Sequence, residues 1–393
     1  MTDNKSRFDD IRPYIDSEVP AVMKRLAGND LLVSSFRIMK WPSCPEPLKG
    51  IADWVVRFLL KKKLSRIRSV TKFQSQIIAD FLLKRIIERS SDSVTYSGIE
   101  KLDKGKSYIF MTNHRDIVMD PALVNYALYL NGFSIPFIAF GDNLLLNDAV
   151  SDLIRINNGI IVKRGLARKE QLEASMHLSE YLNYLRNEGN NFWISQREGR
   201  AKDGIDQTNP AIINMFYLSE RKKEGGFAEF IRQCNIVPAA ISYEKDPCDR
   251  LKAWELYRKN KNGAHIKRKN EDLISMLAGL SGDKGRIHIS FGAPLTGYYE
   301  DKNALATAID KEIHTLYRFW PRNYIAYDHL YKTEKYADKY TEPEKAGFLN
   351  AYNNLKPEVR NLLFTIYANP ICSFESHQMT VSRDKPLASQ QGA

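Results

Sequence analysis

One histidine and two aspartates stand close together in the segment "FMTNHRDIVMDPAL", residues 110–123. His114 follows a short apolar run, Asp116 comes soon after it, and Asp120 directly precedes a proline. A histidine beside a carboxylate can act as a general base, because the acid fixes the imidazole tautomer and stabilises the imidazolium that forms. The alternative is structural: His114 closes a turn and Asp120 caps the next helix. These residues by themselves leave both interpretations open.

Two further segments place cations where a strand is expected to end. "NNGIIVKRG" ends in a basic pair, and "FWISQREGRAKDG" passes from an apolar run into a polar loop. Guanidinium groups at such positions can bind a phosphate, and glycine allows close approach of the backbone. A solvated charge pair is the alternative. The candidate binding residues are Lys163, Arg164, Arg197, Glu198, Gly199 and Arg200.

A proline interrupts the apolar run "IVPAAISY", residues 236–243. Pro238 can shape the wall of a pocket, or it can mark an edge strand or a bulge. The histidines at two other positions are expected to be structural. His177 falls within a long helical pattern, and His288 alternates within a strand.

Strands that alternate with helices must position these side chains. In α/β sheets, ligands bind beyond the carboxyl ends of the strands, where the cations and His114 are expected. The pattern predicts an α/β layered domain. Apolar runs predict strands at 107–112, 135–140, 159–164, 191–196, 236–243 and 286–292, and helical patterns fall at 121–132, 143–156, 166–189 and 303–320.

Three regions are expected: a helical N-terminal region 1–94, the α/β domain 95–300, and a helical C-terminal extension 301–393 with a disordered tail. Within the first, residues 51–90 carry ten basic and three acidic residues at helical spacing. They predict one long helix or a helical hairpin. Such a helix can lie in a membrane interface with Trp54, Phe58 and Phe81 among acyl chains, or it can simply pack on the domain.

The composition narrows the possible functions. The net charge of +11 favours anionic partners. The four cysteines show neither a C-x-x-C pair nor regular spacing, so disulfides and a structural zinc site are not expected. No signal-peptide core and no long apolar span is found. Phosphate-binding glycine loops, H-E-x-x-H and G-x-S-x-G are also missing, which disfavours nucleotide hydrolysis, zinc proteolysis and the usual serine esterase chemistry.

The order and spacing of the four segments carry more information than each alone. N-H-x(5)-D, then G-I-I-V-x-R, then Q-R-E-G-R and finally I-V-P-A resembles the four ordered blocks of the glycerolipid acyltransferase family. This family includes the glycerol-3-phosphate and 1-acylglycerol-3-phosphate acyltransferases. The resemblance covers residues 105–245 and implies a mixed sheet flanked by helices, with helical extensions at both ends.

The resemblance also implies roles for individual residues. It assigns the base to His114 and the orienting carboxylate to Asp120, with Asp116 as a rival because the spacing is one residue longer than in the family. Arg164 matches the arginine of the second block, which binds the phosphate of the acceptor. Glu198, Gly199 and Arg200 match the third block, which is also linked to the acceptor, and Pro238 matches the fourth. Gln196 and Arg197 replace the usual phenylalanine and proline of the third block.

The implied enzyme is an O-acyltransferase of phospholipid biosynthesis. It moves a fatty acyl group from acyl-CoA or acyl carrier protein to the hydroxyl of a lysophospholipid, most simply 1-acyl-sn-glycerol-3-phosphate. Glycerol-3-phosphate and a lyso-aminolipid are alternative acceptors. No metal or resident cofactor is needed, because the thioester is already activated. The expected location is cytoplasmic, peripheral on an anionic inner membrane face.

A different class of function fits part of the same sequence. The basic tracts "KKKLSRIR" and "RKNKNGAHIKRKN" are compatible with a non-catalytic protein that binds membrane or nucleic acid. Since no nucleic-acid-binding motif accompanies them, no nucleic-acid partner is expected.

Overall fold

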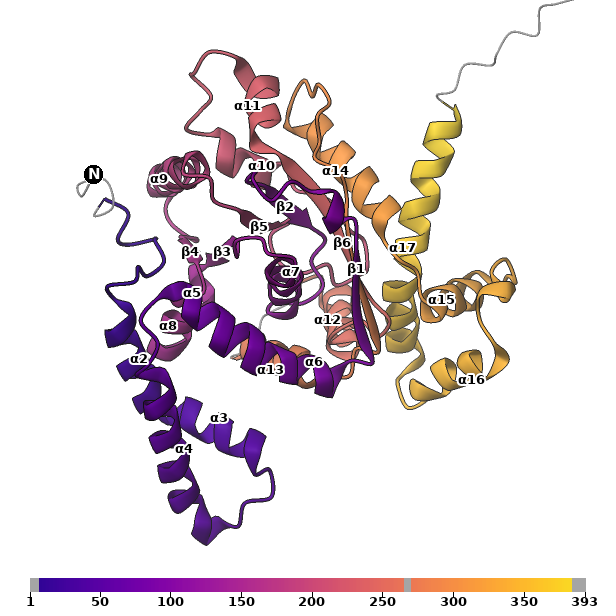
Figure 1. Ribbon diagram of the computed structural model, residues 1–393. Coiled ribbons are helices and arrows are strands. Elements are labelled where there is room, and N and C mark those ends of the chain that lie inside the picture. The colour runs from indigo at the N-terminus through magenta and orange to yellow at the C-terminus, as the bar shows by residue number, and fades with distance from the viewer. Residues whose placement is uncertain (1–6, 265–269, 384–393) are drawn as a thin grey trace, which may run out of the picture. The chain divides into compact units, whose positions relative to one another are not determined.

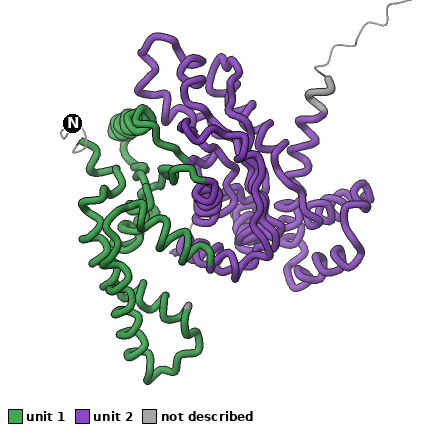
Figure 2. The backbone as a smooth tube through the Cα atoms, in the orientation of Figure 1, with its two compact units in different colours: residues 1–84, 132–192 green, residues 85–131, 193–393 purple. Residues whose placement is uncertain are grey.

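Two compact units make up the protein in the computed structural model, which describes residues 7–264 and 270–383 (Figures 1 and 2). Each unit is assembled from two separate stretches of the chain. The chain passes between the units within α6 (Lys84–Ser90), near Leu130 and within β5 (Phe192–Ser195). Unit 1 comprises residues 1–84 and 132–192, and unit 2 comprises residues 85–131 and 193–393.

Unit 2 contains a mixed sheet with the strand order β1-β7-β6-β2-β5. β2 and β6 are parallel, whereas β6 and β7 are antiparallel. All residues of β2 and β6 are buried, as expected for central strands covered on both faces. The predicted mixed sheet is therefore confirmed. The strands are β1 (Ser93–Ser97), β2 (Ile109–Thr112), β6 (Ile236–Tyr243) and β7 (Arg286–Phe291).

Helices flank this sheet and form the C-terminal extension of unit 2 (Figure 1). α14 packs on β6, and α12, α14 and α15 all pack against α17. The predicted helical extension at the C-terminus is confirmed up to Arg383, while the predicted disordered tail falls mostly outside the described residues. The helices are α7 (Met119–Leu130), α10 (Pro210–Tyr217), α11 (Gly226–Cys234), α12 (Asp249–Asn262), α13 (Glu271–Ser281), α14 (Lys302–Leu316), α15 (Pro321–Tyr331), α16 (Glu342–Ala351) and α17 (Pro357–Arg383), with 3-10 turns η3 (Ile99–Lys101) and η5 (Ala337–Lys339).

Unit 1 combines the N-terminal helices with a parallel pair of strands, β3 (Phe137–Gly141) and β4 (Gly159–Val162). Its core is formed by apolar side chains of α2, the residues around α5, and α8. Helical patterns at this spacing are buried where another element covers them. The helices are α2 (Val19–Gly28), α3 (Asp30–Lys40), α4 (Lys49–Leu64), α5 (Val70–Lys72), α8 (Asp148–Ile156) and α9 (Arg168–Asn187), with η1 (Glu46–Leu48) and η4 (Asp142–Leu144).

The segment 51–90 forms two helical runs rather than one long helix. α4 ends at Leu64, and a second run starts at Val70, where the Ser69 hydroxyl accepts the amide of Lys72. This run passes through the π-helix η2 (Phe73–Leu83) into α6, a bulge that the apolar spacing did not predict. Within residues 7–264 and 270–383, no helix combines the length and apolar character required to cross a bilayer.

The sequence prediction also missed five elements of unit 2, the helices α10, α11, α12 and α13 and the strand β1. β1 was not predicted, because it is an edge strand whose residues are mostly exposed and therefore show no apolar run. The three regions 1–94, 95–300 and 301–393 stay a prediction.

Candidate active site

The chain leaves the sheet of unit 2 at His114, just beyond the carboxyl end of β2. β2 ends at Thr112, which pairs with Ala239 of β6. Asn113 continues the pairing with its side chain: Nδ2 donates to the carbonyl of Ile241 at 3.0 Å, and Oδ1 accepts the amide of Ile241 at 2.8 Å. The asparagine that precedes the histidine therefore holds the start of the turn against β6.

Asp120 is the carboxylate that orients the imidazole in this structure. His114 Nδ1 donates to Asp120 Oδ2 at 2.9 Å, and the His114 side chain is 12% exposed while that of Asp120 is fully buried. Because a neutral imidazole carries one proton, a protonated Nδ1 leaves the lone pair of Nε2 free to accept another. No described residue provides Nε2 with a hydrogen bond. The ring is thus held in the tautomer that a general base requires.

Both carboxylate oxygens of Asp120 accept further hydrogen bonds. Oδ2 also accepts the amides of Arg115 at 2.6 Å and Asp116 at 2.8 Å. Oδ1 accepts the hydroxyl of Tyr243 at 2.7 Å. Sequence reasoning did not single out Tyr243. Its signal was an aromatic hydroxyl at the last position of a predicted strand, where side chains reach the ligand-binding edge of a sheet.

Asp116, the rival carboxylate, holds the start of α7. Its Oδ1 accepts the amides of Val118 at 2.9 Å and Met119 at 2.8 Å, which satisfies donors that the first turn of a helix leaves unpaired. Burial, with the nearby charge of Asp120, raises the pKa of Asp116, and the charge of Arg200 opposes this shift. The spacing between His114 and Asp120 is one residue longer than in the family pattern. The additional residue is accommodated in the turn that Asp116 stabilises.

Arg115 ties this turn to two loops of unit 2. The guanidinium is fully buried, donates to Asp206 at 2.5 Å and to the carbonyl of Gly204 at 3.1 Å, and lies 3.6 Å from Asp246. Burial disfavours its charged form, but Asp206 and Asp246 together keep the pKa of Arg115 raised. A buried charge of this kind is tolerated only with such partners. Arg115 thus fixes the loops that follow β5 and β6 beside His114.

The residues of the third block occupy the loop after β5. The carbonyl of His114 accepts the amide of Ala201 at 2.8 Å, so this loop is attached to the histidine turn. Gly199 has φ +70°, a left-handed conformation that other residues rarely adopt. Glu198 is exposed, Arg197 and Arg200 are half-buried, and the charge of Arg200 acts on Asp116. Unit 2 thus brings Arg200 near the histidine turn, while no contact of Arg197 with His114 is found among the described residues.

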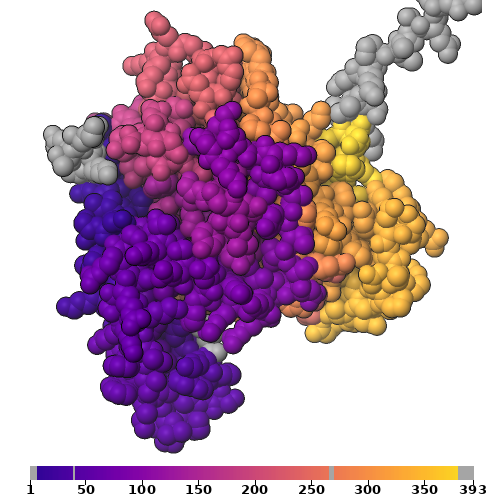
Figure 3. Space-filling model, in the orientation of Figure 1, coloured from indigo at the N-terminus to yellow at the C-terminus, as the bar shows by residue number. Residues whose placement is uncertain are grey.

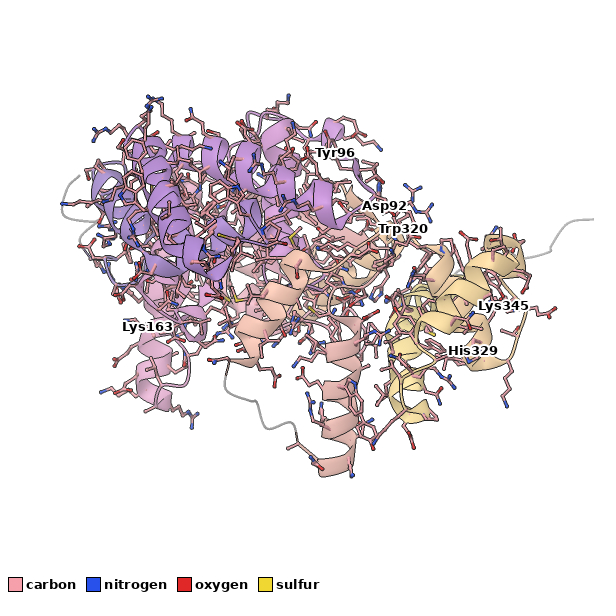
Figure 4. The ribbon with its side chains drawn as sticks, turned by 90° about the horizontal axis from the view of Figure 1, so that it is seen from below. Asp92, Tyr96, Lys163, Trp320, His329 and Lys345 are labelled. Carbon is pink, nitrogen blue, oxygen red and sulfur yellow. The ribbon has the colours of Figure 1, made fainter. Side chains whose placement is uncertain are left out.

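Lys163 and Arg164 belong to unit 1, directly after β4. Lys163, labelled in Figure 4, forms an ion pair with Asp10, and both side chains are about 40% exposed. The amide of Arg164 donates to Asp142 Oδ2 at 3.2 Å. The Arg164 guanidinium packs so closely on Gly141 that a Cβ there would lie 2.8 Å from its Nε. The residues of the second block, at the end of β4, are therefore fixed by contacts within unit 1.

Pro238 lies in a central strand, so the edge-strand interpretation is wrong. β6 is flanked by β7 and β2. The carbonyl of Pro238 accepts the amide of Gly292, the first residue after β7. In a strand the N–H and C=O of one residue point toward the same neighbouring strand. The N–H that proline lacks would therefore have pointed toward Gly292, beyond the last residue of β7. The sheet therefore tolerates the proline without losing a ladder hydrogen bond within β7.

A cavity of about 410 Å³ opens beside the histidine turn in unit 2. It is bounded by residues 245–251, which run from the end of β6 into α12, and by the end of α13. Gly279 lines this cavity and also packs against the carboxylate of Asp116. In the described part of the chain, no cluster of three or more histidine, cysteine or carboxylate side chains could hold a metal ion. The expectation that no cofactor is needed stays a prediction.

Comparison with known proteins identifies the class of domain. Residues 93–242 match the family model Acyltransferase. The chain is 29% identical to a glycerol-3-phosphate acyltransferase of Baumannia cicadellinicola subsp. Homalodisca coagulata, over 49% of this chain and 22% of that protein. It is 23% identical to the dihydroxyacetone phosphate acyltransferase of Mus musculus, over 65% of this chain and 40% of that protein.

Two further proteins are also similar to this chain. A glycerol-3-phosphate acyltransferase of Pseudoalteromonas translucida is 27% identical over 50% of this chain and 22% of that protein. The crystal structure of the 1-acyl-sn-glycerophosphate acyltransferase PlsC from Thermotoga maritima aligns with a TM-score of 0.37 and 14% identity, over 75% of this chain and 91% of that one. The matched relatives are much longer than the parts that align, since this chain spans only 22–40% of their length.

The α/β fold with its histidine–aspartate pair and the matched model together define residues 93–242 as an acyltransferase domain. The predicted resemblance to the glycerolipid acyltransferases is therefore confirmed for this part of the chain.

Proposed function

We propose that the protein transfers a fatty acyl group from a thioester to the hydroxyl of a phosphorylated glycerol-type acceptor. The observation that carries this proposal is the His114–Asp120 hydrogen bond, which directs a free Nε2 away from the carboxylate. Nε2 would take the proton of the acceptor hydroxyl while its oxygen attacks the thioester carbonyl. The new C–O bond forms, the C–S bond breaks, and the imidazolium returns the proton to the leaving thiolate. Such general-base assistance contributes roughly 10²–10⁴-fold to the rate.

The preferred acceptor in this proposal is 1-acyl-sn-glycerol-3-phosphate. Glycerol-3-phosphate and dihydroxyacetone phosphate are second candidates, since these compounds appear in the names of the matched relatives. A lyso-aminolipid is a further candidate acceptor. The third block, which is linked to the acceptor, is changed here, since Gln196 and Arg197 replace the usual phenylalanine and proline. Both acyl-CoA and acyl carrier protein are candidate donors.

The N-terminal helices support a proposed contact with an anionic membrane surface. α3 and α4 lie in the indigo to violet part of Figure 3. Trp54 and Phe58 of α4 stack at 6.1 Å and are 67% and 56% exposed, and lysines at positions 61–63 end the same helix. Aromatic side chains next to lysines are typical of interfacial helices. Phe81, by contrast, is half-buried and stacks on Phe36, so it is left out of the proposed surface. The other exposed apolar side chains of this surface are Leu31, Ile38, Leu48, Ile51 and Leu59.

One experiment tests the catalytic part of the proposal. Purified wild-type protein and His114→Ala are assayed with labelled acyl-CoA or acyl carrier protein and a panel of the acceptors named above. We expect transfer by the wild type and a loss of about 10²-fold or more in the variant. A variant with full activity contradicts the assigned base. A wild type that transfers nothing but binds vesicles supports the non-catalytic alternative.

A matched pair tests the membrane part. Trp54→Ala with Phe58→Ala is expected to weaken flotation with vesicles that contain anionic phospholipid, because each exposed aromatic loses its apolar burial in the interface. The control replaces Tyr298, which is 84% exposed in unit 2, with alanine. Equal flotation of both variants contradicts the proposed surface.

A further inference from the structure

Tyr243 reaches the histidine turn because β6 is longer than its neighbour β2. β2 ends at Thr112, opposite Ala239, whereas β6 continues from Ala240 to Tyr243. The asparagine after β2 bonds to Ile241 and keeps this extension aligned. Asn113 bonds to backbone groups of Ile241, in the plane of the sheet, where β2 would otherwise have continued the pairing. Alternate residues of a strand point to the same face, so the Tyr243 side chain lies on the same face of β6 as that of Ile241. The last side chain of β6 thereby meets the first turn of α7.

The hydroxyl of Tyr243 is the partner of one particular oxygen. It donates to Asp120 Oδ1 at 2.7 Å, while the other oxygen, Oδ2, accepts His114 and two backbone amides. Among the described residues, Tyr243 alone donates to Oδ1. Both residues are buried, with 2% of Tyr243 and none of Asp120 exposed. Burial, together with the charges of Asp120 and Asp116, raises the pKa of Tyr243 well above its ordinary value, so the hydroxyl stays a donor throughout the working pH range.

We propose that Tyr243 is a positioning residue for acyl transfer, which holds Asp120 Oδ1 so that Oδ2 keeps His114 in its base tautomer. The terminal torsion of aspartate is soft, and several donors on a single oxygen restrain its rotation poorly. A bond on the second oxygen fixes the plane of the carboxylate. Without it, Oδ1 becomes a buried acceptor with no partner, which a carboxylate avoids by rotating or by taking a proton. Either change weakens the hold on His114. This inference rests on the proposed function.

A purely structural hydrogen bond would have a different signature. It would lower stability when removed, but its effect on the rate would not depend on Asp120. A double-mutant cycle separates these cases, since residues that act as a unit show non-additive effects. The cycle comprises wild type, Tyr243→Phe, Asp120→Asn and the double variant, with kcat, KM and the thermal midpoint measured for each.

For Tyr243→Phe we expect kcat to fall about tenfold with KM changed by less than about twofold, as for an interaction that matters mainly in the transition state. In the Asp120→Asn background the same replacement is expected to change kcat by less than about twofold. A full tenfold loss in both backgrounds overturns the proposal, as does an unchanged kcat in Tyr243→Phe. If phenylalanine impairs folding, 3-fluorotyrosine at position 243 keeps the donor and is expected to retain kcat within about twofold.

The matched control is Tyr367→Phe. Tyr367 is also 2% exposed, and its hydroxyl donates to Asp249 at 2.8 Å. We expect it to lower the thermal midpoint to a similar extent while kcat stays within about twofold. His114→Ala distinguishes failure of the positioning role of Tyr243 from failure of the proposed acyl-transfer function. If His114→Ala is inactive and the Tyr243 cycle is additive, only the positioning role fails; if His114→Ala is fully active, the proposed function fails.

Discussion

Replacing Gly279 with alanine tests how tightly the histidine turn is packed. Gly279 lies near the end of α13, against the carboxylate of Asp116. A Cβ at this position would meet Asp116 Oδ2 at 2.1 Å, Cγ at 2.8 Å and Oδ1 at 2.9 Å. Asp116 has little room to retreat, because it is fully buried and its Oδ1 holds the amides of Val118 and Met119. The added methyl group therefore pushes on the residues that connect His114 to α7.

Two opposing effects determine the result. Alanine in a helix is more favourable than glycine by about 1 kcal/mol. Overpacking of a buried site costs about 1–3 kcal/mol, and more where atoms overlap as closely as here. We expect the steric cost to win, so Gly279→Ala should lower the free energy of unfolding by about 1–3 kcal/mol. Acyl transfer should fall as well, because Asp116 and Asp120 share the displaced turn.

Urea denaturation and an acyl-transfer assay measure the two effects. The control is Gly347→Ala in α16, where an added Cβ meets no atom within 4 Å; it should raise stability by up to about 1 kcal/mol and leave activity unchanged. Gly279→Ala combined with Asp116→Ala should recover stability relative to Asp116→Ala alone, because the shorter side chain leaves room for the methyl group. Equal stabilisation by Gly279→Ala and Gly347→Ala would refute the packing argument.

Three further outcomes follow from the same structure. In the acyl-transfer assay, Asp120→Asn should lower kcat by at least about tenfold, whereas Asp116→Asn should mainly lower the thermal midpoint, since only Asp120 bonds to the imidazole; the reverse order would contradict this assignment. Arg115→Gln should destabilise the fold by about 3–5 kcal/mol in urea, because it leaves Asp206 and Asp246 without their buried cation; a change below about 1 kcal/mol would contradict the ion-pair role. Burial raises the pKa of Asp310 from 3.8 to about 6, so its contribution to stability is fully present below about pH 4 and is lost as the pH rises through about 6. Asp310→Asn should therefore raise the thermal midpoint more at pH 7.5 than at pH 5.0, and an equal gain at both values would exclude the shift.

The sequence alone determined the α/β order and the edge of the sheet at which chemistry is expected. The predicted strand 236–243 coincides with β6, and the predicted helix 121–132 with most of α7. These elements were predictable because their apolar runs and helical spacing are local properties. The four ordered blocks also led to the acyltransferase family, which the family match supports independently of the structure.

Only the tertiary structure decided which side chains meet. Asp116 and Asp120 both stand near His114 in the chain, and the structure assigns the imidazole to Asp120 and the start of α7 to Asp116. Tyr243 comes to Asp120 through the pairing of β2 with β6, across 123 residues of chain. Arg115, which local sequence would place in solvent, is buried between two distant loops.

The same limit applies to the N-terminal helices. Residues 51–90 have an apolar side throughout, yet Ile67 and Phe73 are buried in the core of unit 1, whereas Trp54 and Phe58 are exposed. Helical periodicity shows that one face is apolar, but not whether another element covers it. Burial depends on contacts between residues far apart in the chain, and those contacts exist only once the chain has folded.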